Sequence, residues 1–332
     1  MRRSEGKGIQ AKTQSKRENA YDAVIMPGSH PLIPTPLPGS VRLVSGRGDL
    51  PCLDVATPHG AAQVYLHGGH VTAWHPSHAD RPVLWMSERS YFQRDKPIRG
   101  GVPVCFPWFG PHPADPGAPA HGFARIEDWT LSDASESGDG SVVLVLTLEG
   151  EASHRAWPYR YRVNHRVEIG TTLKMTLEVH NPGDAAVRFE EALHTYFAVS
   201  DIEQISIAGL RETEYLDKAG GMARRTDHDD AIRFAGETDR VYEETGAACV
   251  IDDPGIRRRI VVTKSGSRST VVWNPWIDKA RAMADFGDAE WRGMVCVETA
   301  NVGQASVILE PGGIHAMAAA IAVERFAAAS AS

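Results

Sequence analysis

The sequence contains little cysteine and no long apolar run. Its cysteines show neither a CxxC spacing nor a histidine arrangement typical of a zinc site; they are Cys52, Cys105, Cys249 and Cys296. We therefore expect reduced, structural thiols and no metal site. No window approaches the roughly 20 apolar residues of a membrane span, and the basic N-terminus lacks the apolar core of a signal peptide. These absences predict a cytoplasmic protein without a membrane partner.

Positive charge is also in deficit. Lys and Arg total 35 against 42 Asp and Glu, which gives a formal net charge of −7. A chain with this balance has no global basic field for nucleic acid, so any anion site must be local. The composition, 42% hydrophobic and 23% charged, is that of an ordinary globular protein with a full core. We expect a monomer that does not bind nucleic acid.

Long helical periodicity is missing as well. From Val41 onward, short segments rich in Val, Ile, Leu, Tyr and Thr alternate with clusters of Gly, Pro, Asp and Asn. The expected strands include 61–66, 141–150, 161–170, 172–179, 258–264 and 293–298. The alanine-rich C-terminal segment is ambiguous, and we expect strand up to about Glu324. The pattern predicts an all-β protein, and the chain length suits a large β-sandwich.

The two ends of the chain differ from its middle. Residues 1–38 combine many charges with a proline-rich run and contain few apolar side chains, so they are expected to form a tail of low order. Residues 326–332 are expected to form a second tail. Between 39 and 325 there is no repeat of fixed period and no change of composition, which predicts a single domain.

A glycine- and proline-rich segment, 96–125, surrounds a cluster of aromatic residues. Its glycines allow backbone to approach a ligand and its prolines stiffen the loop, as suits a preformed pocket wall. Arg99 and Arg125 lie near its two ends, and arginine forks match phosphate oxygens. His121 is expected to face the same pocket. The alternative is a long surface loop with a buried aromatic anchor.

His194 lies in a strand-like segment, 188–199. Regular alternation would place Glu190 and Tyr196 on the same face as His194. We expect these neighbours to set the tautomer of the imidazole and to raise its pKa. The alternative is a buried histidine with a purely structural role.

Glu298 ends the apolar run 294–297, where a strand would be mostly buried. Carboxylates rarely occupy such places without a partner. Glu298 is therefore either an ion-paired strand-end residue or a partly desolvated general base. Three nearby tryptophans form either a stacking platform for a sugar or ordinary core: Trp273, Trp276 and Trp291.

Five separated motifs occur in a definite order: IRGGVPVCFPWFGP, HGFAR, EALHTYF, TDRVY, and VVWNPW followed by CVETANV. Together they resemble the glucose-6-phosphate 1-epimerase (hexose-6-phosphate mutarotase) family of the aldose 1-epimerase superfamily, from about Val41 to about Val323. The resemblance implies a galactose mutarotase-like β-supersandwich. It also implies an isomerase that interconverts the α and β anomers of a hexose 6-phosphate, with glucose 6-phosphate as the expected substrate and without a cofactor.

The same resemblance implies roles for individual residues. The acid of the EALHTYF-like motif falls on His194, and the base of the CVE-like motif falls on Glu298. The arginines before GG and within HGFAR are implied to bind the phosphate, and the aspartate of TDRVY to contact the substrate. The expected substrate-binding residues are Arg99, His121, Arg125 and Asp239.

Ala120 departs from the family pattern, in which a polar Gln or Ser often precedes the histidine of HGFAR. A hydrogen bond to the sugar is therefore absent, and the preferred hexose stays open. One alternative is a non-catalytic carbohydrate-binding β-sandwich. A glycoside hydrolase would need a carboxylate partner for Glu298, which the sequence does not offer. A cupin-like metal site would need His112, His121 and His194 to converge.

Overall fold

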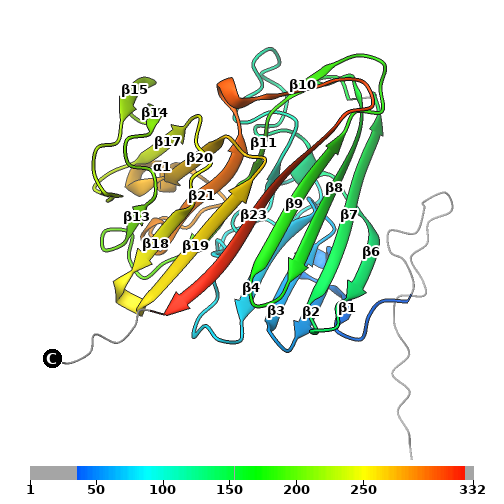
Figure 1. Ribbon diagram of the computed structural model, residues 1–332, viewed down its shortest axis with the longest axis horizontal. Helices are drawn as coiled ribbons and strands as arrows, with labels where there is room; N and C mark the ends of the chain where they lie inside the picture. Colours follow the sequence, from blue (N-terminus) through cyan, green and yellow to red (C-terminus); the bar gives the residue numbers. More distant parts are fainter. Residues whose placement is uncertain (1–35, 153, 326–332) are drawn as a thin grey trace, which may run out of the picture.

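The computed structural model describes residues 36–152 and 154–325. The predicted C-terminal tail, and all of the predicted N-terminal tail except 36–38, lie outside the described residues. The described chain forms four antiparallel sheets, which confirms the all-β prediction (Figure 1). Within it α1, Trp276–Ala282, is the only α-helix, and no helix is long and apolar enough to cross a membrane.

The largest sheet has nine strands and includes most of the strands expected from the sequence. Its order is β16-β13-β18-β19-β23-β9-β8-β7-β6. The bounds are β6 Thr130–Glu136, β7 Val142–Glu151, β8 Arg160–Ile169, β9 Leu173–His180, β13 Ser206–Ala208, β16 Ala231–Ile232, β18 Cys249–Asp253, β19 Arg258–Ser265 and β23 Ile314–Arg325. The alanine-rich C-terminal segment is the strand β23, which lies between β19 and β9.

The second sheet has eight strands, in the order β15-β14-β17-β20-β21-β11-β5, with β12 also paired to β21. The bounds are β5 Val104–Cys105, β11 Glu191–Leu193, β12 Tyr196–Ala198, β14 Glu214–Asp217, β15 Ala223–Thr226, β17 Thr238–Tyr242, β20 Ser269–Asn274 and β21 Met294–Asn301. The strands β5, β11 and β12 are short, and loops connect them to the rest of the chain. These loops border the site described below.

Two smaller sheets complete the fold. One has the order β1-β2-β3-β4, and β10 pairs with β22 in the other. Their bounds are β1 Val41–Ser45, β2 Pro51–Thr57, β3 Gly60–Tyr65, β4 His70–Pro76, β10 Val187–Phe189 and β22 Val307–Leu309. Short 3-10 turns occur in the connections: η1 Arg47–Asp49, η2 Ala124–Ile126, η3 Pro254–Ile256, η4 Glu290–Gly293 and η5 Gly303–Ala305.

The sheets pack in two layers. The nine-stranded sheet crosses the view in Figure 1 as one layer, and the eight-stranded and four-stranded sheets lie behind its two halves. Strand β21 contacts β23, and β3 contacts β8. One continuous core joins the layers, with Trp74, Leu177 and Val297 as fully buried members from the three sheets. This arrangement is a large β-sandwich, as the sequence predicts.

The outer face of the eight-stranded sheet differs from its core face. Because paired residues of antiparallel strands project to the same side, Asp239 opposite Trp273, and Val271 opposite Glu298, share one face. The apolar cluster on this face consists of small or branched side chains: Cys105, Ala192, Val241, Val271, Ala300 and Val302. Their small volume leaves room above the sheet for a pocket.

Candidate active site

A pocket of about 260 Å³ lies on this outer face of the eight-stranded sheet. All six residues predicted as catalytic or substrate-binding line it, although they come from distant parts of the chain. They are Arg99, His121, Arg125, His194, Asp239 and Glu298. The structure therefore brings these six side chains together in one pocket. Ala120 lines the pocket too, which fits its expected proximity to the substrate.

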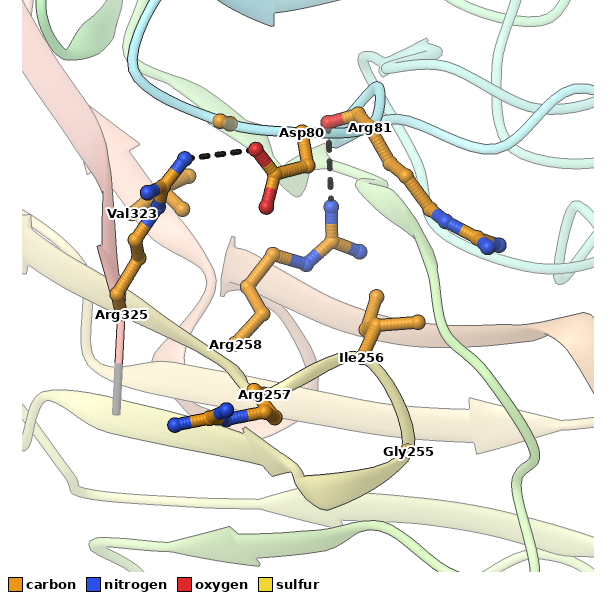
Figure 2. Close-up of a pocket in the computed structure, with 9 residues that line it drawn as sticks. Asp80, Arg81, Gly255, Ile256, Arg257, Arg258, Val323 and Arg325 are labelled. Atoms are coloured by element: carbon orange, nitrogen blue, oxygen red, sulfur yellow. Dashed lines mark hydrogen bonds and ion pairs between the residues drawn. The ribbon is translucent and has the colours of Figure 1, made fainter. Parts of the chain in front are cut away.

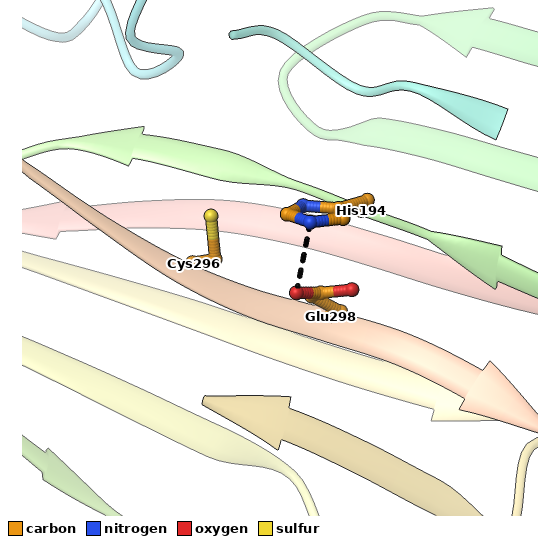
Figure 3. A group of neighbouring side chains, drawn as sticks. All are labelled: His194, Cys296 and Glu298. Atoms are coloured by element: carbon orange, nitrogen blue, oxygen red, sulfur yellow. Dashed lines mark ion pairs between the residues drawn. The ribbon is translucent and has the colours of Figure 1, made fainter. Parts of the chain in front are cut away.

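His194 and Glu298 face each other at the floor of the pocket. Figure 3 shows the imidazole above the carboxylate, with the His194 Nε2 atom 3.3 Å from the Glu298 Oε1 atom. Both side chains are buried, and the second polar atom of each, His194 Nδ1 and Glu298 Oε2, has no hydrogen-bond partner. Polar atoms left unpaired in a buried place are rare and costly, so they mark this pair as a site for a polar ligand.

Burial shifts the pKa values of these two groups in opposite directions. It lowers the pKa of His194 well below its usual range, and the nearby charges of Arg99 and Arg125 lower it further. It raises the pKa of Glu298 well above its usual range, and the carboxylate of Asp239 adds to that shift. Both shifts have the same cause, because a desolvated site disfavours the charged form of either group.

The expected effect of Glu190 on His194 is wrong. The segment 188–199 is not one continuous strand, and His194 lies in the break between β11 and β12. The Glu190 carboxylate accepts hydrogen bonds from the backbone N–H groups of Phe109, at 2.9 Å, and Gly303, at 2.7 Å. It thus anchors two loops, and the pKa of His194 is lowered rather than raised.

Tyr196 does contact His194, but through its ring. The two rings stack with centroids 4.8 Å apart and an interplanar angle of 10°. The His194 backbone N–H also donates to the carbonyl of Pro103 at 3.0 Å, which fixes the chain at this break. The imidazole is therefore oriented by stacking and by its own backbone.

The guanidinium of Arg99 already forms hydrogen bonds with other side chains of this protein. It donates to Asp285, at 3.1 Å and 3.3 Å, and to the hydroxyl of Tyr196, at 3.0 Å. Tyr196 is the residue stacked on His194, so Arg99 is connected to the pair of His194 and Glu298 through one side chain. Such a network holds a charged group in place before a ligand arrives.

Arg125 is buried and lacks an acidic partner. Its guanidinium donates to the Ala120 carbonyl at 2.6 Å, its Nε atom has no hydrogen-bond partner, and no carboxylate of the described residues forms an ion pair with it. A buried cation without a counter-charge costs free energy, and burial lowers the pKa of Arg125. A ligand anion would supply the missing counter-charge.

His121 occupies a constrained turn of the pocket wall. Its φ of 62° lies in the left-handed region, which non-glycine residues rarely adopt. The next residue, Gly122, has no room for a side chain, because a Cβ atom there would lie 2.0 Å from the Phe106 carbonyl oxygen. Burial keeps the pKa of His121 well below its usual range. The turn thus presents a neutral imidazole to the pocket.

Two lysines that the sequence did not single out line the same pocket. Lys218 Nζ lies 3.8 Å from the Asp239 carboxylate and 5.4 Å from the centre of the Phe109 ring. Lys279, on α1, lies 4.0 Å from the same carboxylate. Burial raises the pKa of Asp239, and the two lysines oppose that shift. No spacing in the sequence relates these lysines to the other site residues.

Of the three tryptophans considered for a sugar platform, only Trp273 lines the pocket. It makes edge contacts with the rings of His194 and Tyr196. Trp276 and Trp291 instead contact each other, with centroids 4.4 Å apart and ring planes tilted by 44°, and do not line the pocket. They belong to the packing around α1.

One group of side chains in the described residues could hold a metal ion. His194, Cys296 and Glu298 hold ligand atoms within 4.8 Å of one another, as Figure 3 shows, and are the only such group in the described chain. The three histidines of a cupin-like site do not converge, since His112 instead hydrogen-bonds the carbonyl of Ala156. Because His194 and Glu298 already face each other, the same atoms suit proton transfer.

The expectation that Glu298 has no carboxylate partner is wrong. Asp239 lines the same pocket, and its charge raises the pKa of Glu298. A second carboxylate is thus present. The pocket also holds the pair of His194 and Glu298.

Residues 51–320 match the family model described as aldose 1-epimerase. The chain belongs to this family, and it is an isomerase of the aldose epimerase (mutarotase) class. Among the curated proteins, it is 36% identical over 294 residues to a Cenchrus ciliaris protein named "Putative glucose-6-phosphate 1-epimerase", with 84% of this chain and 86% of the relative covered. An Escherichia coli K12 protein with the same name is 34% identical over 267 residues, covering 80% of this chain and 88% of the relative.

Solved structures agree with this assignment. The crystal structure of a mutarotase-type protein from Salmonella typhimurium superposes with a TM-score of 0.78 at 32% identity, covering 86% of this chain and 97% of that one. A galactose mutarotase-like protein from Clostridium acetobutylicum shares the fold at 13% identity, with a TM-score of 0.65 and coverage of 86% and 98%. The expected family and the mutarotase-like sandwich are therefore confirmed.

Proposed function

We propose that this protein interconverts the α and β anomers of a hexose 6-phosphate, with glucose 6-phosphate as the substrate, and that His194 and Glu298 are the acid and the base. The observation that carries the proposal is the buried pair itself, 3.3 Å apart at the floor of a pocket with four cationic side chains. The names of the two curated relatives point to the same substrate.

Anomerisation requires two proton transfers. Glu298 takes the proton of the anomeric hydroxyl while His194 delivers one to the ring oxygen, so that the ring C–O bond breaks and an open-chain aldehyde forms. Rotation about the C1–C2 bond then exposes the other face of the carbonyl. Reversal of both transfers closes the ring on that face and restores the two side chains.

The pair carries one exchangeable proton throughout this cycle. Before ring opening the proton is on His194, and after it the proton is on Glu298. The opposite pKa shifts favour the neutral form of each group, with the proton on the carboxyl. A raised pKa makes the Glu298 carboxylate a stronger base, and a lowered pKa makes the His194 imidazolium a stronger acid. Burial therefore makes the ionised pair the less populated form and, for the same reason, the form that transfers its protons to and from the substrate more readily.

The cations of the pocket support a phosphorylated sugar. Arg125 lacks a counter-charge, and Lys218 and Lys279 are only loosely paired with Asp239. In this proposal Arg99 and Arg125 bind the phosphate and Lys218 adds charge beside them, because guanidinium forks match phosphate oxygens. Asp239 and neutral His121 contact sugar hydroxyls. A free hexose would leave Arg125 without a counter-charge, whereas Arg99 is paired with Asp285 and Lys279 with Glu237.

The test is the relaxation of freshly dissolved α-glucose 6-phosphate, followed by polarimetry or by a dehydrogenase that consumes one anomer. We expect wild type to accelerate relaxation, and His194→Ala or Glu298→Gln to return it close to the buffer rate. The matched control is Glu191→Gln, since Glu191 is another buried glutamate that pairs with a histidine, the partly exposed His315, at 2.9 Å and away from the pocket.

Two outcomes would contradict the proposal. If either pocket variant keeps wild-type rates while folded, the assignment of acid and base is wrong. If wild type binds the sugar phosphate without accelerating its relaxation, the non-catalytic carbohydrate-binding alternative is correct.

A further inference from the structure

A second hollow, of about 350 Å³, lies at the edge of the nine-stranded sheet. It is formed by the loop after β4, by η3 with the start of β19, and by the end of β23. Four arginines line it, together with Asp80 (Figure 2): Arg81, Arg257, Arg258 and Arg325. We call this feature the arginine hollow. None of its lining residues lines the epimerase pocket.

Arg258 is the buried member of this group. Only 5% of it is exposed, and its guanidinium donates to the carbonyls of Pro82, at 2.9 Å, and Ala198. No carboxylate forms an ion pair with it in the described chain, and its Nε atom has no hydrogen-bond partner. A cation held in this way by neutral carbonyls keeps its full positive charge at the wall of the hollow.

Arg81 and Arg257 are exposed on the rim. Within residues 36–152 and 154–325 neither guanidinium has an ion-pair or hydrogen-bond partner. Arg325 is the exception, since it pairs with Asp80 at 2.6 Å (Figure 2). Three arginines without a direct ion-pair partner thus line one concave place in a protein whose formal net charge is −7, and the charge of Asp253 only partly offsets that of Arg258. Their mutual repulsion persists until an anion enters.

We propose that the arginine hollow binds the phosphate group of a small soluble metabolite, at a site separate from the epimerase pocket. A phosphate dianion offers several acceptor oxygens and double charge, which suits three guanidiniums better than a single carboxylate. The apolar side chains of Ile256 and Val323 also line the hollow and provide contact for the organic part. A concave site suits a small molecule better than a flat lipid surface.

The site lies beside the structure that supports His194. Arg258 hydrogen-bonds the carbonyl of Ala198, at the end of β12, and β12 begins with Tyr196, the residue stacked on His194. The hollow and the substrate pocket share no lining residue, so an anion in the hollow leaves the substrate pocket open. Binding there and anomerisation are separable, and the present inference stands or falls independently of the proposed function.

The experiment is calorimetric titration with inorganic phosphate at an ionic strength of about 0.01 M, where screening is weak. Arg81→Ala/Arg257→Ala should weaken one component of phosphate binding at least tenfold, with KM and kcat for anomerisation unchanged. Arg42→Ala/Arg162→Ala removes the same charge from exposed positions outside the hollow and should bind like wild type.

A third variant separates the two sites. Arg125→Met removes a cation of the epimerase pocket and should leave the component that depends on Arg81 and Arg257 intact. The inference is overturned if the Arg81/Arg257 variant binds phosphate like wild type, or if Arg125→Met abolishes all phosphate binding. Cosedimentation with phosphatidylglycerol vesicles covers the lipid source: binding to vesicles that needs Arg81 and Arg257, without binding of inorganic phosphate, would also overturn it.

Discussion

Replacing Glu298 by glutamine tests the proposed base with little change of shape. The side chain is 1% exposed, so a substitution that keeps its volume preserves the packing of the pocket floor. Glutamine cannot accept the proton of the anomeric hydroxyl. A positioned general base contributes about 100- to 10,000-fold, which corresponds to about 2.7–5.4 kcal/mol at 1.36 kcal/mol per tenfold change. We expect kcat/KM to fall within this range.

The same variant should not lose stability. Burial raises the pKa of Glu298 well above its ordinary value of 4.5. At pH values above 4.5 the unfolded chain gains by ionising this group while the folded protein resists it, so the carboxyl lowers the free energy of unfolding there. Below 4.5 both states are protonated and the penalty is absent. Glu298→Gln should therefore be at least as stable as wild type near neutral pH, with the difference vanishing in acid.

The assay combines anomerisation rates with thermal unfolding at neutral and acidic pH. Glu191→Gln is the contrasting control, since it removes a buried carboxylate that accepts a hydrogen bond from Asn301 at 2.8 Å and pairs with His315. That variant should lose stability and keep its activity. The reasoning is refuted if Glu298→Gln retains wild-type activity, or if it is destabilised near neutral pH as much as Glu191→Gln.

Three further predictions concern pH, the phosphate and the core. Because the active pair holds one proton, kcat/KM should persist well below pH 6.5, the ordinary pKa of histidine, and decline on the alkaline side as Glu298 loses the last proton; an acidic limb at or above 6.5 would argue against a lowered His194 pKa. Arg125→Met should raise KM for glucose 6-phosphate at least tenfold and hardly change KM for glucose, whereas equal effects on both sugars would remove its phosphate role. Leu177→Ala, at a fully buried core position, should lower the free energy of unfolding by about 2–5 kcal/mol in denaturant titrations, and a change below about 1 kcal/mol would contradict its place in the core.

Much of the fold could be predicted because a strand can be recognised from the pattern of apolar residues in a short stretch of sequence. The alternation of β9 places Leu173, Met175, Leu177 and Val179 on the buried face, and the sequence shows the same period. The alanine-rich C-terminal segment was also expected to be a strand, because apolar residues alternate along it, and it forms β23. The order of strands within the sheets, by contrast, depends on pairing between distant segments, which no local pattern contains.

The sequence predicted only those residues of the candidate site that lie within its motifs. Each motif is a contiguous run, so His194 and Glu298 were found, but their 3.3 Å contact depends on β21 pairing with both β11 and β12. Lys218 follows β14 and Lys279 lies on α1, and only the three-dimensional fold brings them to Asp239. The predicted role of Glu190 was wrong because one continuous strand was assumed, whereas the strand is interrupted between β11 and β12.

The register of β21 links catalysis to the stability of the fold. Neighbouring residues of a strand face opposite sides, so Val297 packs into the core between the layers while Glu298 faces the pocket. A slip of one residue would exchange them and place a carboxylate among apolar side chains, at a cost of several kcal/mol. The core therefore enforces the register that keeps Glu298 opposite Val271 and within reach of His194. The desolvation that shifts both pKa values is a consequence of the same packing, so the acid–base pair depends on the sandwich as a whole.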